Sequence, residues 1–201
     1  MLVAGIKSRP TYAGIAIDPH ARRHIFALEG EGALALTEQG EALTPAVLAR
    51  SEILYTPSGS KGEDHDQRLA ALQPDMFWQG PTIATLLFRL KGSLSNATMG
   101  TRLYIAGTEG FIGQAMQIAL DLGMDFNSIP TEHRGSLARR VQCVHCKGIT
   151  ENVTVSPFPC SHCGLPLLVR DHYSRRLAAF QGVNIDAEEP GTAPEPEELF
   201  S

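Results

Sequence analysis

Compact apolar runs alternate with amphipathic stretches through the first 136 residues, and the two patterns predict different elements. Apolar runs bounded by turn residues indicate strands, and they occur at 24–28, 53–56 and 101–106. Apolar residues recur every three or four positions over 83–94 and 112–122, as expected of helices that bury one face. The first two thirds of the chain therefore contain both strands and helices.

The order of these elements predicts an α/β fold. The strand at 101–106 leads through a glycine turn into the helix at 112–122, and a further strand is expected at 126–130. Strand, helix and strand in this order form a unit with parallel strands. A short helix is expected at 45–50, with a proline at its first position, and the polar stretch 59–67 is expected to be an exposed loop.

The chain divides by composition into three parts. We expect a small Rossmann-like parallel-sheet lobe over 1–136, a four-cysteine zinc ribbon over 137–170, and a docking segment with an acidic, proline-rich tail over 171–201. The docking segment has the composition of a short helix. The tail from Ala187 is rich in glutamate and proline, which favours disorder over a docking peptide.

All four cysteines of the chain lie in two Cys-x-x-Cys pairs separated by thirteen residues: Cys143, Cys146, Cys160 and Cys163. Two such turns that face each other offer four thiolates in a tetrahedral arrangement, which suits zinc or, less commonly, iron. Gly148 and Gly164 follow the two pairs and are expected to turn the chain back with positive φ.

A complete set of four thiolates leaves no coordination position for water or substrate, so the predicted metal is structural rather than catalytic. His145 and His162 lie inside the pairs and are expected to be exposed rather than ligands. A rubredoxin-like iron site remains the redox alternative. A disulfide framework is disfavoured because no secretory signal is evident in the sequence.

Composition argues against nucleic-acid and membrane binding. The net charge is −5, aromatic residues make up 6%, and no apolar run reaches the length of a membrane span. Five arginines at the two ends of the ribbon are expected to be solvated or interface residues: Arg139, Arg140, Arg170, Arg175 and Arg176. We expect a cytoplasmic protein.

Other groupings of reactive side chains favour ordinary structural roles. The consecutive residues 171–174 contain Asp, His and Ser, but neighbouring side chains diverge and cannot form a catalytic relay. His20 and His24 would share a helix face, yet Pro19 and the strand after it argue against a helix. The acidic cluster 63–66 is expected to be solvated, and Trp78 to be a core or interface anchor.

The stretch 102–132 resembles the C-terminal part of the nicotinamide-binding domain of ferredoxin-reductase-type flavoproteins. It has an apolar strand, a glycine turn at Gly107, a helix that ends in glycine, and a glutamate at Glu132. Ala106 and Thr108 stand where that family has cysteine and proline, and no flavin motif or clean glycine-rich loop is found, 57–62 being a poor substitute. A degenerate, cofactor-free reductase scaffold is therefore expected.

The lobe, the ribbon and the sequence that follows it together resemble the small, delta-type accessory subunit of dimethylamine monooxygenase, also described as haem-dependent oxidative N-demethylase. The resemblance implies three kinds of partner subunit. One carries haem, one is a reductase with FMN and a 2Fe–2S cluster that uses NADPH, and one binds tetrahydrofolate and resembles aminomethyltransferases. It implies a non-catalytic role for this chain in removing a methyl group from a secondary amine. The alternative is a redox protein with rubredoxin-type iron or residual nucleotide or flavin binding.

Overall fold

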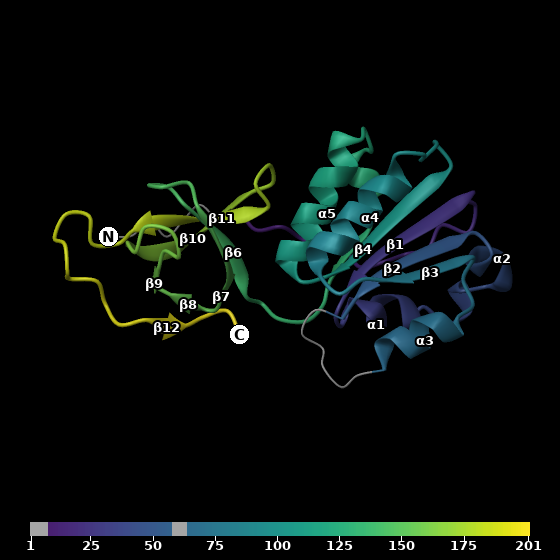
Figure 1. Cartoon of the computed structure of the whole chain (residues 1–201), viewed down its shortest axis with the longest axis horizontal. Helices are drawn as coiled ribbons and strands as arrows, with labels where there is room; N and C mark the ends of the chain where they lie inside the picture. Colours follow the sequence, from purple (N-terminus) through teal and green to yellow (C-terminus); the bar gives the residue numbers. More distant parts are fainter. Residues whose placement is uncertain (1–7, 58–63) are drawn as a thin grey trace. The chain divides into compact units, whose positions relative to one another are not determined.

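The computed structural model describes residues 8–57 and 64–201, and these residues form two compact units (Figure 1). One unit covers 12–135, and the other covers 136–201 together with residues 8–11. None of the helices in the described ranges is both long and apolar enough to cross a bilayer.

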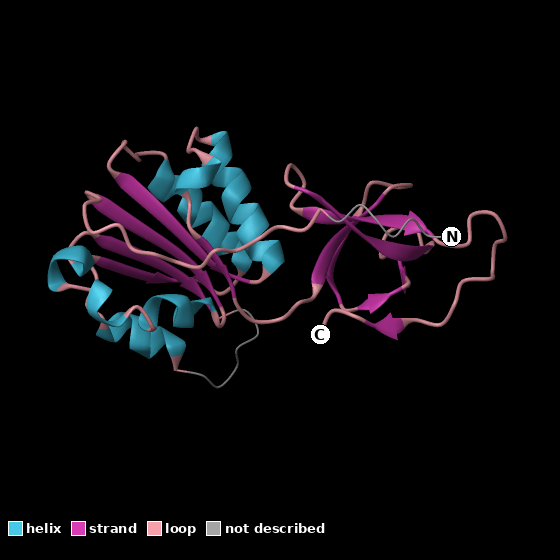
Figure 2. Ribbon diagram, turned by 180° about the vertical axis from the view of Figure 1, so that it is seen from behind, coloured by secondary structure: helices cyan, strands magenta, loops and turns pink. Residues whose placement is uncertain are grey.

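The 12–135 unit is built on a five-stranded parallel sheet with strand order β3-β2-β1-β4-β5. Helices α4 and α5 cover one face of this sheet, and α1 and α3 cover the other (Figures 1 and 2). The fold class expected from the sequence is therefore confirmed. The elements are β1 (Arg23–Glu29), α1 (Gly32–Thr37), η1 (Gly40–Ala42), α2 (Pro45–Leu48), β2 (Ser51–Thr56), α3 (His65–Ala71), β3 (Met76–Gln79), α4 (Ile83–Leu94), β4 (Thr101–Gly107), α5 (Glu109–Asp121), η2 (Phe126–Ser128) and β5 (Thr131–His133).

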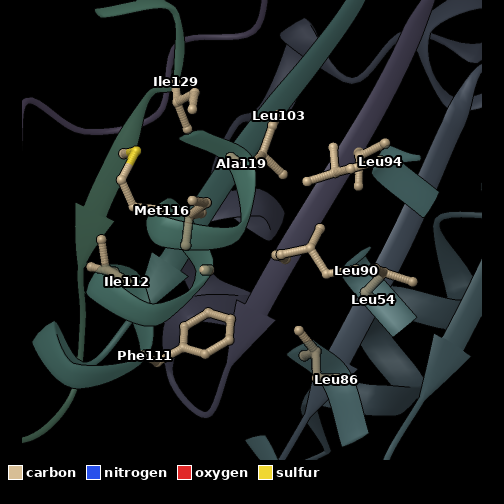
Figure 3. Packing of buried hydrophobic residues seen from close by; sticks show 14 residues of the cluster. Leu54, Leu86, Leu90, Leu94, Leu103, Phe111, Ile112, Met116, Ala119 and Ile129 are labelled. Atoms are coloured by element: carbon tan, nitrogen blue, oxygen red, sulfur yellow. The ribbon is translucent and has the colours of Figure 1, made fainter. Parts of the chain in front are cut away.

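Side chains of the central strands alternate between two apolar layers, because successive residues of a strand point to opposite faces. Ile25 and Ala27 of β1 face the layer under α4 and α5, whereas Phe26 and Leu28 face the layer under α1 and α3. Figure 3 shows the first layer, in which leucines of α4 and apolar residues of α5 meet over the sheet. A strand buried on both faces explains the continuous apolar runs seen in the sequence.

Several local predictions for this unit are wrong. The strand expected at 126–130 is the short helix η2, and β5 begins later, at Thr131. Residues 59–63 of the expected loop 59–67 lie outside the described residues, and they include Glu63 of the acidic cluster 63–66. Residues 58–62 of the stretch 57–62 lie outside them as well. The described residues of the expected loop, 64–67, form the N-cap and first turn of α3. His65 was expected to be solvated, but it is buried, with 3% of its surface exposed.

Trp78 lies on β3, an element the sequence pattern missed, and it packs against the α4–α5 layer. The Trp78 ring also accounts for the presence of glycine at position 80. A Cβ atom on Gly80 would lie 2.2 Å from the Trp78 ring, so a side chain there would displace the indole. Because this is the single tryptophan of the chain, its fluorescence reports on the 12–135 unit alone.

His24 gives this unit a predicted pH dependence. It is fully buried in β1 beside Tyr104, and burial, together with the charge of Arg50, lowers the pKa of its imidazole despite an opposing effect of Asp18. The unfolded chain therefore binds a proton below about pH 6.5 that the folded chain resists, and protonation favours unfolding.

We expect the free energy of unfolding, followed by Trp78 fluorescence in urea, to fall between pH 7.5 and pH 5.5. The His24 contribution is at most about 1.4 kcal/mol per pH unit. The variant His24→Phe, which keeps an aromatic ring in the stack with Phe26 and Tyr104, should lose this part of the slope. Equal slopes in the two proteins would contradict the assignment.

The second unit is a β structure. Its main sheet has the order β7-β6-β11-β10-β9, and a separate pair joins β12 to β8. Its apolar core contains residues from the sheet and Phe200 from the C-terminal segment. The strands are β6 (Arg139–Cys143), β7 (Ile149–Val153), β8 (Val155–Ser156), β9 (Phe158–Pro159), β10 (Pro166–Ser174), β11 (Ala179–Asn184) and β12 (Glu197–Glu198).

The helix expected within 171–186 is absent from the described residues. β10 continues to Ser174, turns, and pairs with β11 as an antiparallel hairpin. β11 also pairs with β6, so this hairpin completes the sheet that carries the first cysteine pair. The expectation of a disordered tail is wrong for its last residues, because β12 pairs with β8 and Phe200 is 8% exposed.

Candidate metal centre

Each cysteine pair occupies the turn of an antiparallel hairpin. Cys143 ends β6 and Cys146 lies between β6 and β7, whereas Cys160 and Cys163 both lie between β9 and β10. The sheet positions both turns, since β6 and β10 each pair with β11. Residues far apart in the sequence therefore present their sulfurs to one point.

The two turns repeat the same backbone hydrogen bonds. In the first, Cys143 N donates to Gly148 O at 2.9 Å and Lys147 N donates to Cys143 O at 3.0 Å. In the second, the N–H groups of Cys160 and Gly164 make the corresponding bonds to Leu165 O and Cys160 O, both at 2.9 Å. This repeat is the physical reason that two separate Cys-x-x-Cys segments adopt one shape.

The expected positive φ is found at Gly164, at 75°, but not at Gly148. In the first turn Lys147 takes this conformation, with φ of 64°. Gly148 is required for another reason, because a Cβ atom there would lie 2.4 Å from the ring of His162. The prediction for Gly148 is therefore corrected: close contact with a histidine, rather than backbone conformation, excludes a side chain.

The four sulfurs form one cluster within 4.8 Å of one another. Cys143 Sγ lies 3.9 Å from Cys163 Sγ, and Cys146 Sγ lies 3.7 Å from Cys160 Sγ. A tetrahedral ion with sulfur ligands at about 2.3 Å requires sulfur separations of about 3.8 Å. These distances fit a metal and are far longer than the roughly 2.05 Å of a disulfide.

Backbone N–H groups help to hold charge on the sulfurs. Burial disfavours a charged Cys160 sulfur, but the N–H groups of Cys163 and His162 and the neighbouring thiols lower the pKa of Cys160 to about 6. The N–H of Leu165 donates to Cys163, yet burial and the bonds among the thiols raise the pKa of Cys163 to about 12. A bound cation would favour all four thiolates by offsetting their charge.

The histidines inside the turns are not part of the sulfur cluster. His145 and His162 are both exposed. Nε2 of His162 lies 2.9 Å from the carbonyl oxygen of Ile149, the first residue of β7. This ring nitrogen is therefore engaged in a contact with the first hairpin. Only the four cysteines form a group of possible metal ligands within the described ranges.

A buried arginine ties the ends of the chain to this unit. Arg139 is 6% exposed, and its guanidinium lies 4.0 Å from the ring centres of both Phe180 and Phe200. Its Nη1 atom pairs with Asp171 at 2.9 Å, and Asp171 also pairs with Arg9 at 2.6 Å. The expectation that Arg139 is a solvated or interface arginine is therefore wrong.

Phe200 offers a direct test of this arrangement. Replacing Phe200 by alanine removes a buried ring and one cation–π contact, and we expect a loss of about 3 kcal/mol in the stability of the 136–201 unit. The segment 187–201 should then become sensitive to protease. Leu199→Ala, at a neighbouring side chain that is 54% exposed, is the matched control. Equal protease resistance of both variants would contradict the docking of the tail.

The remaining candidate groupings do not form sites. Residues 171–174 lie along β10, and the carboxylate of Asp171 pairs with Arg9 and Arg139, so it is engaged by arginines rather than orienting a catalytic histidine. His20 is exposed in a turn, whereas His24 is buried in β1. Residues 29–32 were interpreted from the sequence only as a turn after the strand, and the Gly-x-Gly-x-x-Ala spacing of residues 30–35 was missed, although it is visible in the sequence.

Comparisons with known proteins agree on one family. The family described as dimethylamine monooxygenase subunit DmmA-like matches through its N-terminal domain at residues 4–129 and through its C-terminal domain at residues 140–183. The haem-dependent oxidative N-demethylase delta subunit of Ectopseudomonas mendocina (strain ymp) is 32% identical over 151 residues, which cover 71% of this chain and 84% of that protein.

Solved structures give weaker likenesses. Phthalate dioxygenase reductase superposes with a TM-score of 0.46 and 13% identity, covering 72% of this chain and 47% of that one. An intact type IV self-sufficient cytochrome P450 monooxygenase superposes with a TM-score of 0.44 and 16% identity, covering 84% of this chain and 28% of that one. This chain thus spans less than half of either structure, and TM-scores below 0.5 carry no conclusion about it.

Proposed function

Because the chain belongs to the dimethylamine monooxygenase subunit DmmA-like family, we propose that it is a non-catalytic accessory subunit of a haem-dependent oxidative N-demethylase. The relative with curated function is the delta subunit of such an enzyme, and a delta subunit belongs to a multi-subunit assembly. Oxidative removal of a methyl group from a secondary amine then takes place in the companion chains.

The closed set of four sulfurs supports this proposal most strongly. A metal held by Cys143, Cys146, Cys160 and Cys163 has all four positions of a tetrahedron filled by protein, so no coordination position is left for substrate or water. When bound, zinc supplies the charge that keeps four thiolates together and links two hairpins. The chain's own residues shape the cluster, and the sheet around it becomes a rigid surface for assembly.

Zinc is the proposed metal, and the cytoplasm, where thiols stay reduced, is the proposed compartment. A specific observation also favours a second candidate, a rubredoxin-type iron site in an electron-transfer protein. N–H groups of His162 and Cys163 point at the sulfur of Cys160, and such bonds stabilise iron–sulfur centres as well. The two metals differ in colour, because iron–thiolate sites absorb visible light and zinc–thiolate sites do not.

The proposed partners are those that the family resemblance implies. They are a subunit with haem, a reductase subunit with FMN and a 2Fe–2S cluster, and a folate-binding subunit related to aminomethyltransferases. The 136–201 unit is the proposed contact surface, since its two hairpins are fixed by the metal. Arg139 is excluded from that surface because it is buried within the unit.

Reconstitution with the partner subunits tests the proposal. The isolated chain should neither oxidise NADPH nor release formaldehyde from dimethylamine, and it should co-purify with the other subunits in a defined ratio on size-exclusion chromatography. Omitting it should impair assembly or activity of the complex. Demethylation of the amine by the isolated chain, or a fully active complex that never contains it, would overturn the proposal.

A further inference from the structure

The sheet of the 12–135 unit has the order of five of the six strands of a doubly wound dinucleotide-binding fold. In sheets of order 3-2-1-4-5, ligands bind outside the carboxyl ends of the strands, where the order reverses. Here that point lies between β1 and β4. The turn after β1 and the start of α1, from Gly30 to Ala35, have the Gly-x-Gly-x-x-Ala spacing of a phosphate-binding turn. Topology and spacing both place a phosphate here.

A carboxylate of the protein occupies this point. Glu29 is the last residue of β1 and is 4% exposed. Its Oε2 atom accepts hydrogen bonds from the backbone N–H and the hydroxyl of Thr108, each at 2.8 Å. Thr108 is the N-cap of α5, a helix of thirteen residues, and the N-terminus of a helix is where an anion is held.

The glycines at the start of α1 and at the end of β4 serve contacts within the protein rather than approach to a ligand. A Cβ atom on Gly32 would lie 2.1 Å from the carbonyl oxygen of Ala106. A Cβ atom on Gly107 would lie 2.8 Å from Oε2 of Glu29 and 3.0 Å from its backbone oxygen. The start of α1 therefore packs directly against the end of β4, and the Glu29 carboxylate lies against the turn that follows.

The surroundings of Glu29 add further negative charge. Glu31 is exposed in the same loop, and Glu109 is the first residue of α5. Oε1 of Glu109 accepts a hydrogen bond from the hydroxyl of Tyr12 at 3.0 Å, which places the segment entering this unit beside α5. A dinucleotide phosphate would meet these three carboxylates, whereas the guanidinium of Arg134, a residue whose backbone N–H donates to Gly107 O, is already paired with Glu38 and Glu132.

We infer that Glu29 takes the place of the phosphate group of a dinucleotide, so that the 12–135 unit satisfies its own anion site and binds no nicotinamide nucleotide. The residues do not fit the cofactor that the strand order implies. This inference goes beyond the proposed function, since an accessory subunit could bind a nucleotide and a nucleotide-free chain could still transfer electrons through iron.

Calorimetric titration of the full chain with NADPH and with inorganic pyrophosphate tests this inference. The wild-type chain should bind neither probe with a Kd below about 1 mM. Replacing Glu29 by serine exposes the N-terminus of α5, and pyrophosphate should then bind at least about tenfold more tightly than to wild type. Glu31→Ser removes an exposed acid from the same loop and is the matched control.

Glu29→Ala also removes the carboxylate from the N-terminus of α5 and serves if Glu29→Ser does not fold. Wild-type binding of NADPH or pyrophosphate below about 1 mM would overturn the inference. So would a folded Glu29 variant whose affinity for pyrophosphate equals that of Glu31→Ser. Neither result depends on whether the chain joins a demethylase, so failure here is distinguishable from failure of the proposed function.

Discussion

Replacing Cys160 by serine is expected to unfold the 136–201 unit and to leave the 12–135 unit folded. Cys160 is 3% exposed, its sulfur lies 3.7 Å from that of Cys146, and its backbone N–H closes the second turn. A serine hydroxyl replaces a thiolate ligand poorly because it stays protonated and is a harder donor.

The expected effect is large because the metal supplies most of the stability of such a unit. Structural zinc contributes roughly 10–16 kcal/mol in zinc-finger peptides, whereas a whole small domain is stable by only about 5–15 kcal/mol. We therefore expect Cys160→Ser to lose its metal and to lose hydrogen-exchange protection throughout the strands β6, β7, β10 and β11. Co-purification with partner subunits should be lost as well.

Two controls separate this result from general damage. Ser161→Ala changes the next residue in the same turn, whose hydroxyl lies 2.9 Å from that of Thr150, and it should keep the metal. The urea transition followed by Trp78 fluorescence should be the same in Cys160→Ser and wild type, since Trp78 lies in the other unit. A Cys160→Ser chain with full metal content and native exchange protection would contradict a structural role for this centre.

The second large effect is expected from Gly32→Ala. The added methyl would lie 2.1 Å from the Ala106 carbonyl oxygen and 2.8 Å from the backbone nitrogen of Gly107. Both atoms belong to the backbone of a central strand, so α1 must move away from β4. Overpacking of this kind costs about 1–3 kcal/mol, and a contact with rigid backbone places Gly32→Ala at the upper end, about 3 kcal/mol.

Gly92→Ala is the matched control for this substitution. A Cβ atom on Gly92 meets nothing within 4 Å, and the residue lies inside α4. Alanine favours a helix over glycine by about 1 kcal/mol, so Gly92→Ala should be neutral or stabilising. Urea unfolding followed by Trp78 fluorescence measures both variants. A Gly32→Ala chain as stable as wild type would show that the start of α1 does not pack against β4 as described.

The sequence predicted those features that depend on strong local patterns. The spacing of the four cysteines was sufficient to group them, because two Cys-x-x-Cys turns that face each other present four thiolates to one metal ion. The helix containing Leu86, Leu90 and Leu94 was evident from its period, and the parallel sheet followed from the order of elements. These features depend on residues that are close in sequence.

Features that depend on distant partners were not predicted. The stretch from Asp171 to Phe180 has helix-forming and charged residues, yet it is a hairpin because β11 pairs with β6, some forty residues earlier in the chain. Phe200 follows an acidic, proline-rich segment that suggests disorder, but its ring covers the buried Arg139 guanidinium. No local pattern reveals such a contact.

Glu29 is a case in which a local motif was present in the sequence but a distant contact changes its meaning. The spacing of the glycines after β1 could have been recognised, and by itself it would have predicted a bound phosphate. The reason against a phosphate is the hydrogen-bonded contact between Glu29 and Thr108, which are 79 positions apart. The motif indicates the position of an anion, and only the packing shows that the protein supplies it.

Metal analysis of the purified full chain tests the central claim most directly, which is that a saturated metal centre braces this chain and takes no part in redox chemistry. The account predicts about one zinc per chain, no visible absorption, and no spectral change on addition of dithionite. A chain that carries about one iron, absorbs visible light and is bleached by dithionite would contradict it.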